Sequence, residues 1–226
     1  MKPNQLTNIS ETSEKRKNTI LSFLDFSSPT SEQETALVAM ADFVSKDKFE
    51  DYLILSGAAG TGKTSITTAL IQYLNSEDIN YKIAAPTGRA ARILGKKSKA
   101  TSSTIHSLIY NSVSNPNTGE VIFKLKPNPV KDYTVYILDE ASMISTIVTH
   151  DEASLFVSTN SLLNDLVEFV KDGNPLNKMI LLGDRNQLPP IHEDFSKALS
   201  QDYLIEQYSL EGNAYQLTEV KRQQKD

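Results

Sequence analysis

The chain contains no cysteine and no tryptophan. Without cysteine it forms neither disulfide bonds nor thiolate metal sites, and this composition is compatible with a reducing cytoplasm, where we expect the protein. No apolar run approaches the length of a membrane span, and no signal-peptide pattern is present, so we expect no membrane partner. An excess of positive charge is also lacking, because 28 acidic residues outnumber 23 Lys and Arg residues and the formal net charge is −5. A nucleic-acid site would therefore have to be a local basic groove on an acidic body.

The apolar fraction is 39%, and four nearly continuous apolar runs lie at 52–57, 81–86, 135–140 and 178–184. Such runs are typical of parallel strands that are buried on both faces. Helical patterns lie between the runs, and this alternation predicts an α/β domain with a central parallel sheet. The segment 215–220 is a candidate fifth strand.

Two other segments precede or interrupt this alternation. Residues 1–27 are polar and then weakly helical, which predicts a leader or a docking helix. A helix should follow, capped by Thr30 or Ser31 with Gln33 or Glu34 as the capping-box partner. Residues 111–132 combine Asn-Pro-Asn-Thr-Gly turn chemistry with a period-two stretch, "EVIFKL", and predict a small inserted β-hairpin.

The stretch "GAAGTGKTS" fits the phosphate-binding pattern G-x-x-x-x-G-K-[ST], with an apolar strand before it and a helix after it. Glycines let the backbone wrap a phosphate, and the helix N-terminus presents free N–H groups to the anion. Lys63 would reach the β- and γ-phosphates, and Thr64 would bind Mg²⁺. The alternative is a glycine-rich turn without a ligand. The predicted nucleotide-binding residues of the loop are Gly57, Ala58, Ala59, Gly60, Thr61, Gly62, Lys63, Thr64 and Ser65.

Two further strand ends carry polar groups that suit the same ligand. In "VYILDEAS", Asp139 can hold Mg²⁺ through water, and Glu140 can orient or deprotonate the attacking water. The alternative is a solvated strand exit. In "ILLGDRNQLPPI", Gln187 lies in a loop that two prolines stiffen. Because parallel strand ends converge on one crevice, we predict that Gln187 senses the γ-phosphate, against the alternative of a plain turn.

Taken in order, these segments resemble the motifs of superfamily 1B DNA helicases of the RecD and phage Dda type, from about Thr30 to Gln223. "TSEQ" resembles the adenine-contacting Q motif and points to Gln33. "AAPTGRAA" (84–91) resembles motif Ia, and "STIHSL" (103–108) resembles motif Ib. "LDEASM" and "GDRNQLPP" resemble motifs II and III. "QLTEVKRQ" (216–223) resembles motif IV and would place Arg222 near the γ-phosphate.

The resemblance implies a RecA-like P-loop NTPase domain that binds ATP, Mg²⁺ and single-stranded DNA. The family moves 5′ to 3′ and separates duplexes, so the single-strand/duplex junction is a second expected partner. The residues that the resemblance assigns to DNA are Pro86, Thr87, Arg89, Thr104 and His106.

The predicted hairpin has the place of the family's strand-splitting pin, with Phe123 as the candidate wedge because an aromatic face stacks on bases. The alternative is that Phe123 forms the hairpin's own small core. Lys124 and Lys126 on the hairpin are well placed for DNA. The cluster of Lys96, Lys97 and Lys99 is interpreted as a solvated helix end.

The family's second RecA-like domain, with motifs V and VI, would follow motif IV, and we expect it as a partner in a longer parent chain. Motif VI supplies an arginine to the transferred phosphoryl group. The sequence given would then bind nucleotide, hydrolyse it poorly and not unwind DNA alone. Two alternatives stay open: another P-loop enzyme such as a small-molecule kinase, and a non-hydrolysing module that docks DNA or protein.

Overall fold

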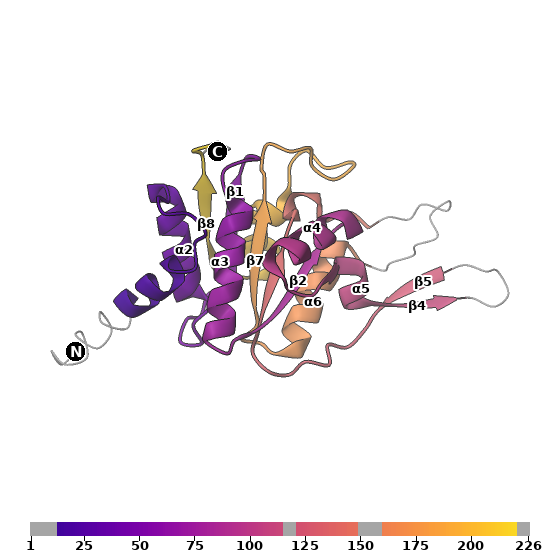
Figure 1. The fold of residues 1–226 in the computed structure, drawn as a ribbon. Helices are drawn as coiled ribbons and strands as arrows, with labels where there is room; N and C mark the ends of the chain where they lie inside the picture. Colours follow the sequence, from indigo (N-terminus) through magenta and orange to yellow (C-terminus); the bar gives the residue numbers. More distant parts are fainter. Residues whose placement is uncertain (1–12, 115–120, 149–159, 221–226) are drawn as a thin grey trace.

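The computed structural model describes residues 13–114, 121–148 and 160–220. Its main sheet has the order β3-β2-β6-β7-β1-β8, and every neighbouring pair is parallel (Figure 1). The predicted parallel sheet is therefore confirmed. Its strands are β1 Tyr52–Gly57, β2 Asn80–Ala85, β3 Ser102–Thr104, β6 Thr134–Leu138, β7 Lys178–Gly183 and β8 Gly212–Leu217.

Two strands differ from their predictions. The edge strand β3 was not predicted, because it has three polar residues and no apolar run. The candidate strand 215–220 is present as β8 but ends at Leu217. The chain leaves the sheet there because the N–H groups of Thr218 and Glu219 donate to the carboxylate of Glu32 instead of to β1.

Helices cover both faces of the sheet and create two cores. In β1, Leu53 and Leu55 belong to one core, while Tyr52 and Ile54 belong to the other. This burial on both sides explains the continuous apolar runs. The first core packs against α2 Ser31–Phe43, α3 Lys63–Ser76 and α4 Gly88–Ser98. The second packs against α5 Ile105–Ile109, α6 Leu162–Gly173, α7 Gln201–Tyr208 and the short η1 Ala141–Met143 and η2 Lys197–Leu199.

The N-terminal part of the described chain packs beside α2. Thr30 caps α2 and forms the capping box with Gln33, so one of the two predicted pairs is present. Residues 13–21 are helical, Ile20 is fully buried in the first core, and Lys17 pairs with Glu34 at 3.0 Å. Among the described residues, no helix is both long and apolar enough to cross a membrane.

The predicted hairpin is also present. Strands β4 Tyr110–Ser114 and β5 Val121–Leu125 pair in antiparallel fashion, with Tyr110 opposite Leu125 and Ser112 opposite Phe123. Figure 1 shows this two-stranded sheet extending sideways from the domain, beyond α5. At its base, the Lys126 N–H donates to the Ile109 carbonyl at 2.9 Å.

Candidate nucleotide-binding site

The loop between β1 and α3 has the backbone geometry of a phosphate-binding loop. Gly60 and Gly62 have φ values of 87° and 91°, in the left-handed region that side chains disfavour. A Cβ on Gly62 would also lie 2.6 Å from Nε2 of Gln33. The Thr61 hydroxyl donates to the Ala58 carbonyl at 2.9 Å and closes the loop on itself. No side chain caps α3, so the N–H groups of its first turn remain for an anion.

Lys63 lies at the centre of the site. Its ammonium donates to the carbonyls of Gly57 and Ala58. Burial lowers the pKa of Lys63, while the carboxylates of Asp184, Glu140 and Asp139 oppose that shift. Three acids that follow β6 and β7 therefore act electrostatically on one lysine at the start of α3. Asp139 and Glu140 were predicted from the sequence to lie at this site. Asp184 is part of the motif after β7, but no function was predicted for it.

Asp139 and Glu140 follow β6 directly. Glu140 adopts the left-handed conformation, with φ of 51°, and its N–H donates to Oδ1 of Asp139 at 3.0 Å. Burial raises the pKa of Asp139, and the charge of Glu140 adds to the rise, while Lys63 and Lys97 oppose it. A carboxylate that is costly to bury as an anion gains from a nearby cation.

The Thr64 hydroxyl and the Asp139 carboxylate are both oxygen donors, as Mg²⁺ requires. Within the described ranges, no three His, Cys, Asp or Glu side chains cluster to hold a metal alone. Mg²⁺ sites beside nucleotides commonly take one or two protein groups and complete their shell with phosphates and water, so the donor chemistry of Thr64 and Asp139 suits the ion.

The loop after β7 is tied to the loop after β6. The Gln187 N–H donates to the Asp184 carbonyl at 3.2 Å, and the Asn186 N–H donates to Oδ1 of Asp184 at 2.9 Å. The Ser142 hydroxyl then reaches Oε1 of Gln187 at 3.4 Å, a long hydrogen bond. Gln187 therefore contacts the segment that carries Asp139 and Glu140. Sequence reasoning missed Ser142, although it lies three residues after Asp139 in the quoted motif.

Gln33 braces the phosphate-binding loop from behind. Its Oε1 accepts from the Thr30 N–H at 2.9 Å, and its Nε2 donates to the Thr61 carbonyl at 3.0 Å. Only 3% of the residue is exposed. The structure thus gives Gln33 a supporting position at the loop, and its contact with adenine stays a prediction.

Arg222 lies outside the described residues. The segment before it is held by Glu32, whose carboxylate accepts from the N–H and the hydroxyl of Thr218, each at 2.6 Å. These hydrogen bonds lower the pKa of Glu32, that from the Thr218 hydroxyl most. Val220 then lies beside Gly60 of the phosphate-binding loop.

The residues that the resemblance assigns to DNA come from two segments that the sheet brings together. Thr87 caps α4 by accepting from the Ala90 N–H at 3.2 Å, and Thr104 caps α5 by accepting from the Ser107 N–H at 3.1 Å. Because β2 and β3 pair, Thr104 lies next to Gly88 at the start of α4. Pro86 and Arg89 flank this point in the chain, and Arg89 is exposed. DNA contact by all of these residues stays a prediction.

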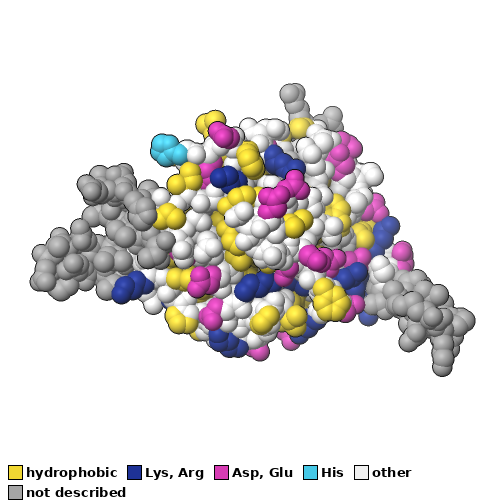
Figure 2. Space-filling model, turned by 180° about the vertical axis from the view of Figure 1, so that it is seen from behind, with side chains coloured by type: hydrophobic (Ala, Val, Ile, Leu, Met, Phe, Trp, Pro, Cys, Tyr) yellow, Lys and Arg dark blue, Asp and Glu magenta, His cyan; other side chains and the backbone are white. Residues whose placement is uncertain are grey.

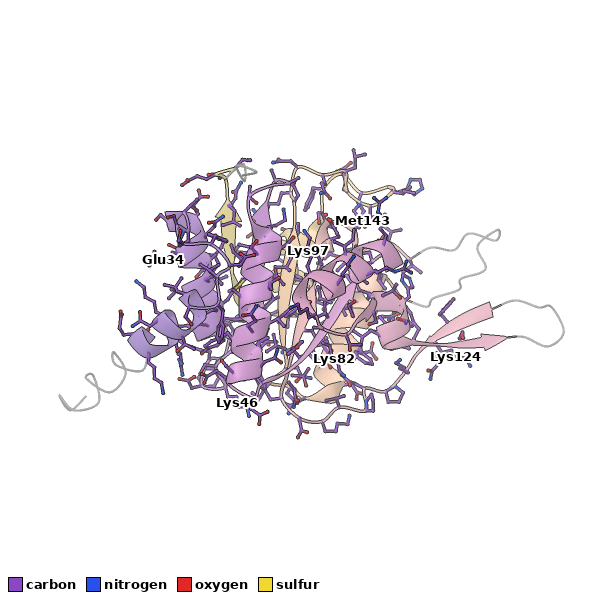
Figure 3. The ribbon with its side chains drawn as sticks, in the orientation of Figure 1. Glu34, Lys46, Lys82, Lys97, Lys124 and Met143 are labelled. Carbon is purple, nitrogen blue, oxygen red and sulfur yellow. The ribbon has the colours of Figure 1, made fainter. Side chains whose placement is uncertain are left out.

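His106 and Phe123 form an aromatic cluster with Tyr110 at the base of the hairpin. The ring centroid of Phe123 lies 6.1 Å from that of Tyr110 and 6.4 Å from that of His106, and both ring pairs meet edge to face. Burial lowers the pKa of His106. Phe123 is partly buried against the second core, which favours the small-core alternative over the wedge. Lys126 donates to the Ser107 carbonyl at 3.0 Å, whereas Lys124 is exposed on β5 (Figure 3).

A glycine-rich loop after a parallel strand, its lysine, and acids at two neighbouring strand ends define the chain as a P-loop NTPase domain. The AAA domain family matches residues 30–226, and the chain belongs to this family.

Two relatives confirm the resemblance to RecD and Dda. The chain is 32% identical over 142 residues to the ATP-dependent RecD2 DNA helicase of Deinococcus radiodurans, covering 62% of this chain and 16% of that protein. It is 32% identical over 177 residues to the ATP-dependent DNA helicase Dda of phage T4, covering 76% of this chain and 35% of that protein. The chain thus spans about a third or less of these relatives.

A solved structure shows the same fold. The Pif1 helicase of Candida albicans aligns with a TM-score of 0.55 and 21% identity, over 89% of this chain and 42% of that one.

Proposed function

We propose that this chain is the ATP-binding first motor domain of a 5′–3′ DNA helicase. In the full-length protein it would couple ATP hydrolysis to translocation on single-stranded DNA and to duplex unwinding. The observation that carries the proposal is the phosphate-binding loop with Gly60 and Gly62 at positive φ before the uncapped start of α3, together with the Ser142 hydroxyl hydrogen-bonded to Gln187. Small-molecule kinases have no evident use for the hydrogen bond between Ser142 and Gln187, whereas a motor needs a group that responds to the state of the γ-phosphate. Two relatives that are helicases by name support the same reading.

Each residue has a role that its position allows. Lys63 would exchange its two loop carbonyls for the β- and γ-phosphate oxygens, and the loop N–H groups would bind the same phosphates. Thr64 and Asp139 would hold Mg²⁺, which neutralises charge on the phosphates when bound. Glu140 would orient or deprotonate the attacking water. Gln187 would bind a phosphoryl oxygen or that water, and Arg222 would approach the γ-phosphate from motif IV.

The hydrogen bond between Ser142 and Gln187 would transmit a structural change at the nucleotide to the rest of the domain. A change at the γ-phosphate would break or remake this hydrogen bond, and Pro189 and Pro190 limit how far the loop absorbs the change. The strand end that bears Asp139 pairs with β2, which leads directly into Pro86 and Thr87. Single-stranded DNA would bind at this edge, with the duplex junction near the hairpin. The second RecA-like domain would close on the nucleotide from the parent chain.

The test is nucleotide binding and ATP hydrolysis by this chain, with and without a single-stranded oligonucleotide. Lys63→Ala should weaken nucleotide binding about 10- to 100-fold, because charge-assisted hydrogen bonds are worth about 1.5–3 kcal/mol. Lys82→Ala removes an exposed lysine from β2 and should leave binding unchanged (Figure 3). Glu140→Gln should keep nucleotide binding and abolish the hydrolysis that remains.

Turnover by the chain alone should be slow, because the arginine of the second domain is needed for charge stabilisation. Equal nucleotide binding by wild type and Lys63→Ala would refute the nucleotide site. ATP consumption that depends on a small phosphoacceptor would favour the kinase alternative. DNA binding that nucleotide leaves unchanged, with no hydrolysis in any variant, would favour the docking module.

A further inference from the structure

Helix α4 carries a stripe of basic side chains, of which Arg89 alone belongs to the predicted DNA residues described above. Its positive residues Arg89, Arg92 and Lys96 follow one another at spacings of three and four, and Lys99 caps the C-terminal end of the helix in the left-handed conformation. Residues with these spacings lie on one face of a helix. All four are exposed, and no acidic residue occurs in 88–99. Lys97 lies off the stripe, and its charge acts on Asp139 instead.

A shallow groove of about 590 Å³ lies between α4 and the edge strand β3. The helix comes close to the strand because Gly95 has no side chain, since a Cβ there would collide with Ser102 and lie 2.9 Å from the Ala100 carbonyl. Arg92 and Lys96 form the helical wall. The opposite wall is formed by the hydroxyl residues Ser102, Ser103 and Thr104.

The charge of this groove is not balanced by neighbours. Across the described parts of the chain, no ion pair involves a residue of the stripe. The opposite face of the molecule differs, since Figure 2 shows Lys and Arg side chains interspersed there with Asp and Glu. On a chain with a net charge of −5, an unpaired basic stripe creates a local positive field.

The groove is continuous with the predicted DNA site. Its lining includes Gly88, which follows Thr87 directly, and Thr104, which caps α5. From there it follows α4, whose 11 residues extend about 16 Å. Arginine, lysine, serine and threonine side chains are the groups that proteins use to hold phosphate oxygens without reading bases.

We propose that the α4–β3 groove binds the phosphate backbone of a DNA strand, and that it extends the DNA path beyond Thr87 and Thr104. Arg92 and Lys96 hold the phosphates from one wall, and the Ser103 hydroxyl donates from the β3 wall, where the hydroxyls of Ser102 and Thr104 already donate to the Ala91 carbonyl and to Ser107. The proposed contacts go to phosphate oxygens, so binding in the groove does not depend on the base sequence of the DNA. This inference rests on the proposed function, because it needs the DNA to be at the Thr87 edge.

The test compares two double variants of equal charge change. Arg92→Gln/Lys96→Gln removes the groove cations, and Lys46→Gln/Lys48→Gln removes two exposed lysines from the turn after α2, at the distant end of the molecule where Figure 3 labels Lys46. Binding of a fluorescent single-stranded oligonucleotide is followed by anisotropy over a range of salt concentrations. Each lost phosphate contact lowers the slope of log Kobs against log salt by about 0.7. The groove variant should lose about 1.4 from the slope and bind at least about 10-fold more weakly at low salt.

The control variant should keep the wild-type slope, and both variants should keep nucleotide binding and the thermal midpoint. Arg92→Lys/Lys96→Arg, which keeps both charges, should bind DNA as wild type does. If the wild type binds DNA and the groove variant has the same slope as the control, the inference is overturned while the proposed function stands. If the wild type binds no DNA at any salt concentration, the proposed function fails together with the inference. Polyglutamate serves in the same assay as a model of an acidic protein. If the groove variant loses binding to polyglutamate but keeps its binding to DNA, the inference is overturned in favour of an acidic protein partner.

Discussion

The hydroxyl of Tyr110 anchors the hairpin to the body of the domain, and its removal should cost more than an ordinary buried hydroxyl. Tyr110 is the first residue of β4, and its OH donates to Oδ2 of Asp165 in the first turn of α6 at 2.6 Å. Asp165 is 3% exposed. The bond is therefore short, charge-assisted and shielded from water, and the N-terminal end of α6 further favours a carboxylate at this position.

The magnitude follows from a comparison within the chain. The OH of Tyr133 also donates inside the protein, to the carbonyl of Val44 at 2.8 Å, and the two tyrosines are 6% and 7% exposed. Tyr133→Phe loses a bond to a neutral acceptor and should cost about 1 kcal/mol. Tyr110→Phe loses a bond to a buried carboxylate and should cost about 2–3 kcal/mol. In a chain of this size the difference corresponds to a few degrees in the thermal midpoint.

Urea denaturation followed by circular dichroism measures both variants, provided that the m-value stays constant. The double variant Tyr110→Phe/Asp165→Asn should recover part of the loss, because an amide does not leave an unpaired buried charge. The reasoning is refuted if Tyr110→Phe costs no more than Tyr133→Phe, or if Asp165→Asn shows no coupling to it. Hydrogen exchange gives a second readout, since the amides of β4 should lose protection selectively in Tyr110→Phe.

Two further predictions concern the nucleotide loop and a buried lysine. Gly62→Ala should abolish nucleotide binding and destabilise the chain by about 2 kcal/mol, because it adds a Cβ at φ of 91° and against Gln33. Gly88→Ala is its control, since a Cβ there meets nothing closer than 3.9 Å; equal effects of both in calorimetry and nucleotide titration would contradict the argument. Burial lowers the pKa of Lys178 from 10.5 to about 8. The unfolded chain then holds this proton at higher pH than the folded chain does, so stability should rise with pH between about 8 and 10.5, by about 3 kcal/mol at most. This rise should be absent from Lys178→Met in urea titrations; an opposite slope would mean that the Phe43, Ser45 and Lys48 carbonyls hold the ammonium more strongly than burial opposes it.

The parallel sheet and the nucleotide loop were predictable because their causes are local. Strands buried on both faces need continuous apolar residues, and the phosphate loop needs glycines at fixed positions before a lysine. The edge strand β3 had no such signal, since its three polar residues form a strand only because β2 offers them a partner. The end of β8 was predicted three residues too late, because Glu32, far away in the sequence, captures the Thr218 and Glu219 N–H groups.

The predicted roles of individual side chains also depend either on local sequence or on long-range contacts. Lys63, Asp139 and Glu140 were identified from the sequence, and their electrostatic interaction in the structure agrees with a common site. The adenine contact of Gln33 and the wedge role of Phe123 were assigned by resemblance, whereas the capping-box role of Gln33 was predicted from the local pattern and is confirmed. In the structure Gln33 binds the loop carbonyl of Thr61, and Phe123 packs against Tyr110. Contacts between residues so far apart in the chain leave no trace in local periodicity.

The sequence by itself therefore determined the class of the domain, through apolar runs and a short motif whose chemistry depends on neighbours in the chain. Only the tertiary structure decided which charges are paired and which are free. It brought Asp184 within electrostatic range of Lys63, placed Asp165 at the hydroxyl of Tyr110, and left Arg92 and Lys96 lining an open groove. The physical reason is that motif geometry is set by backbone conformation, whereas charge pairing and burial depend on which strands and helices the fold brings together.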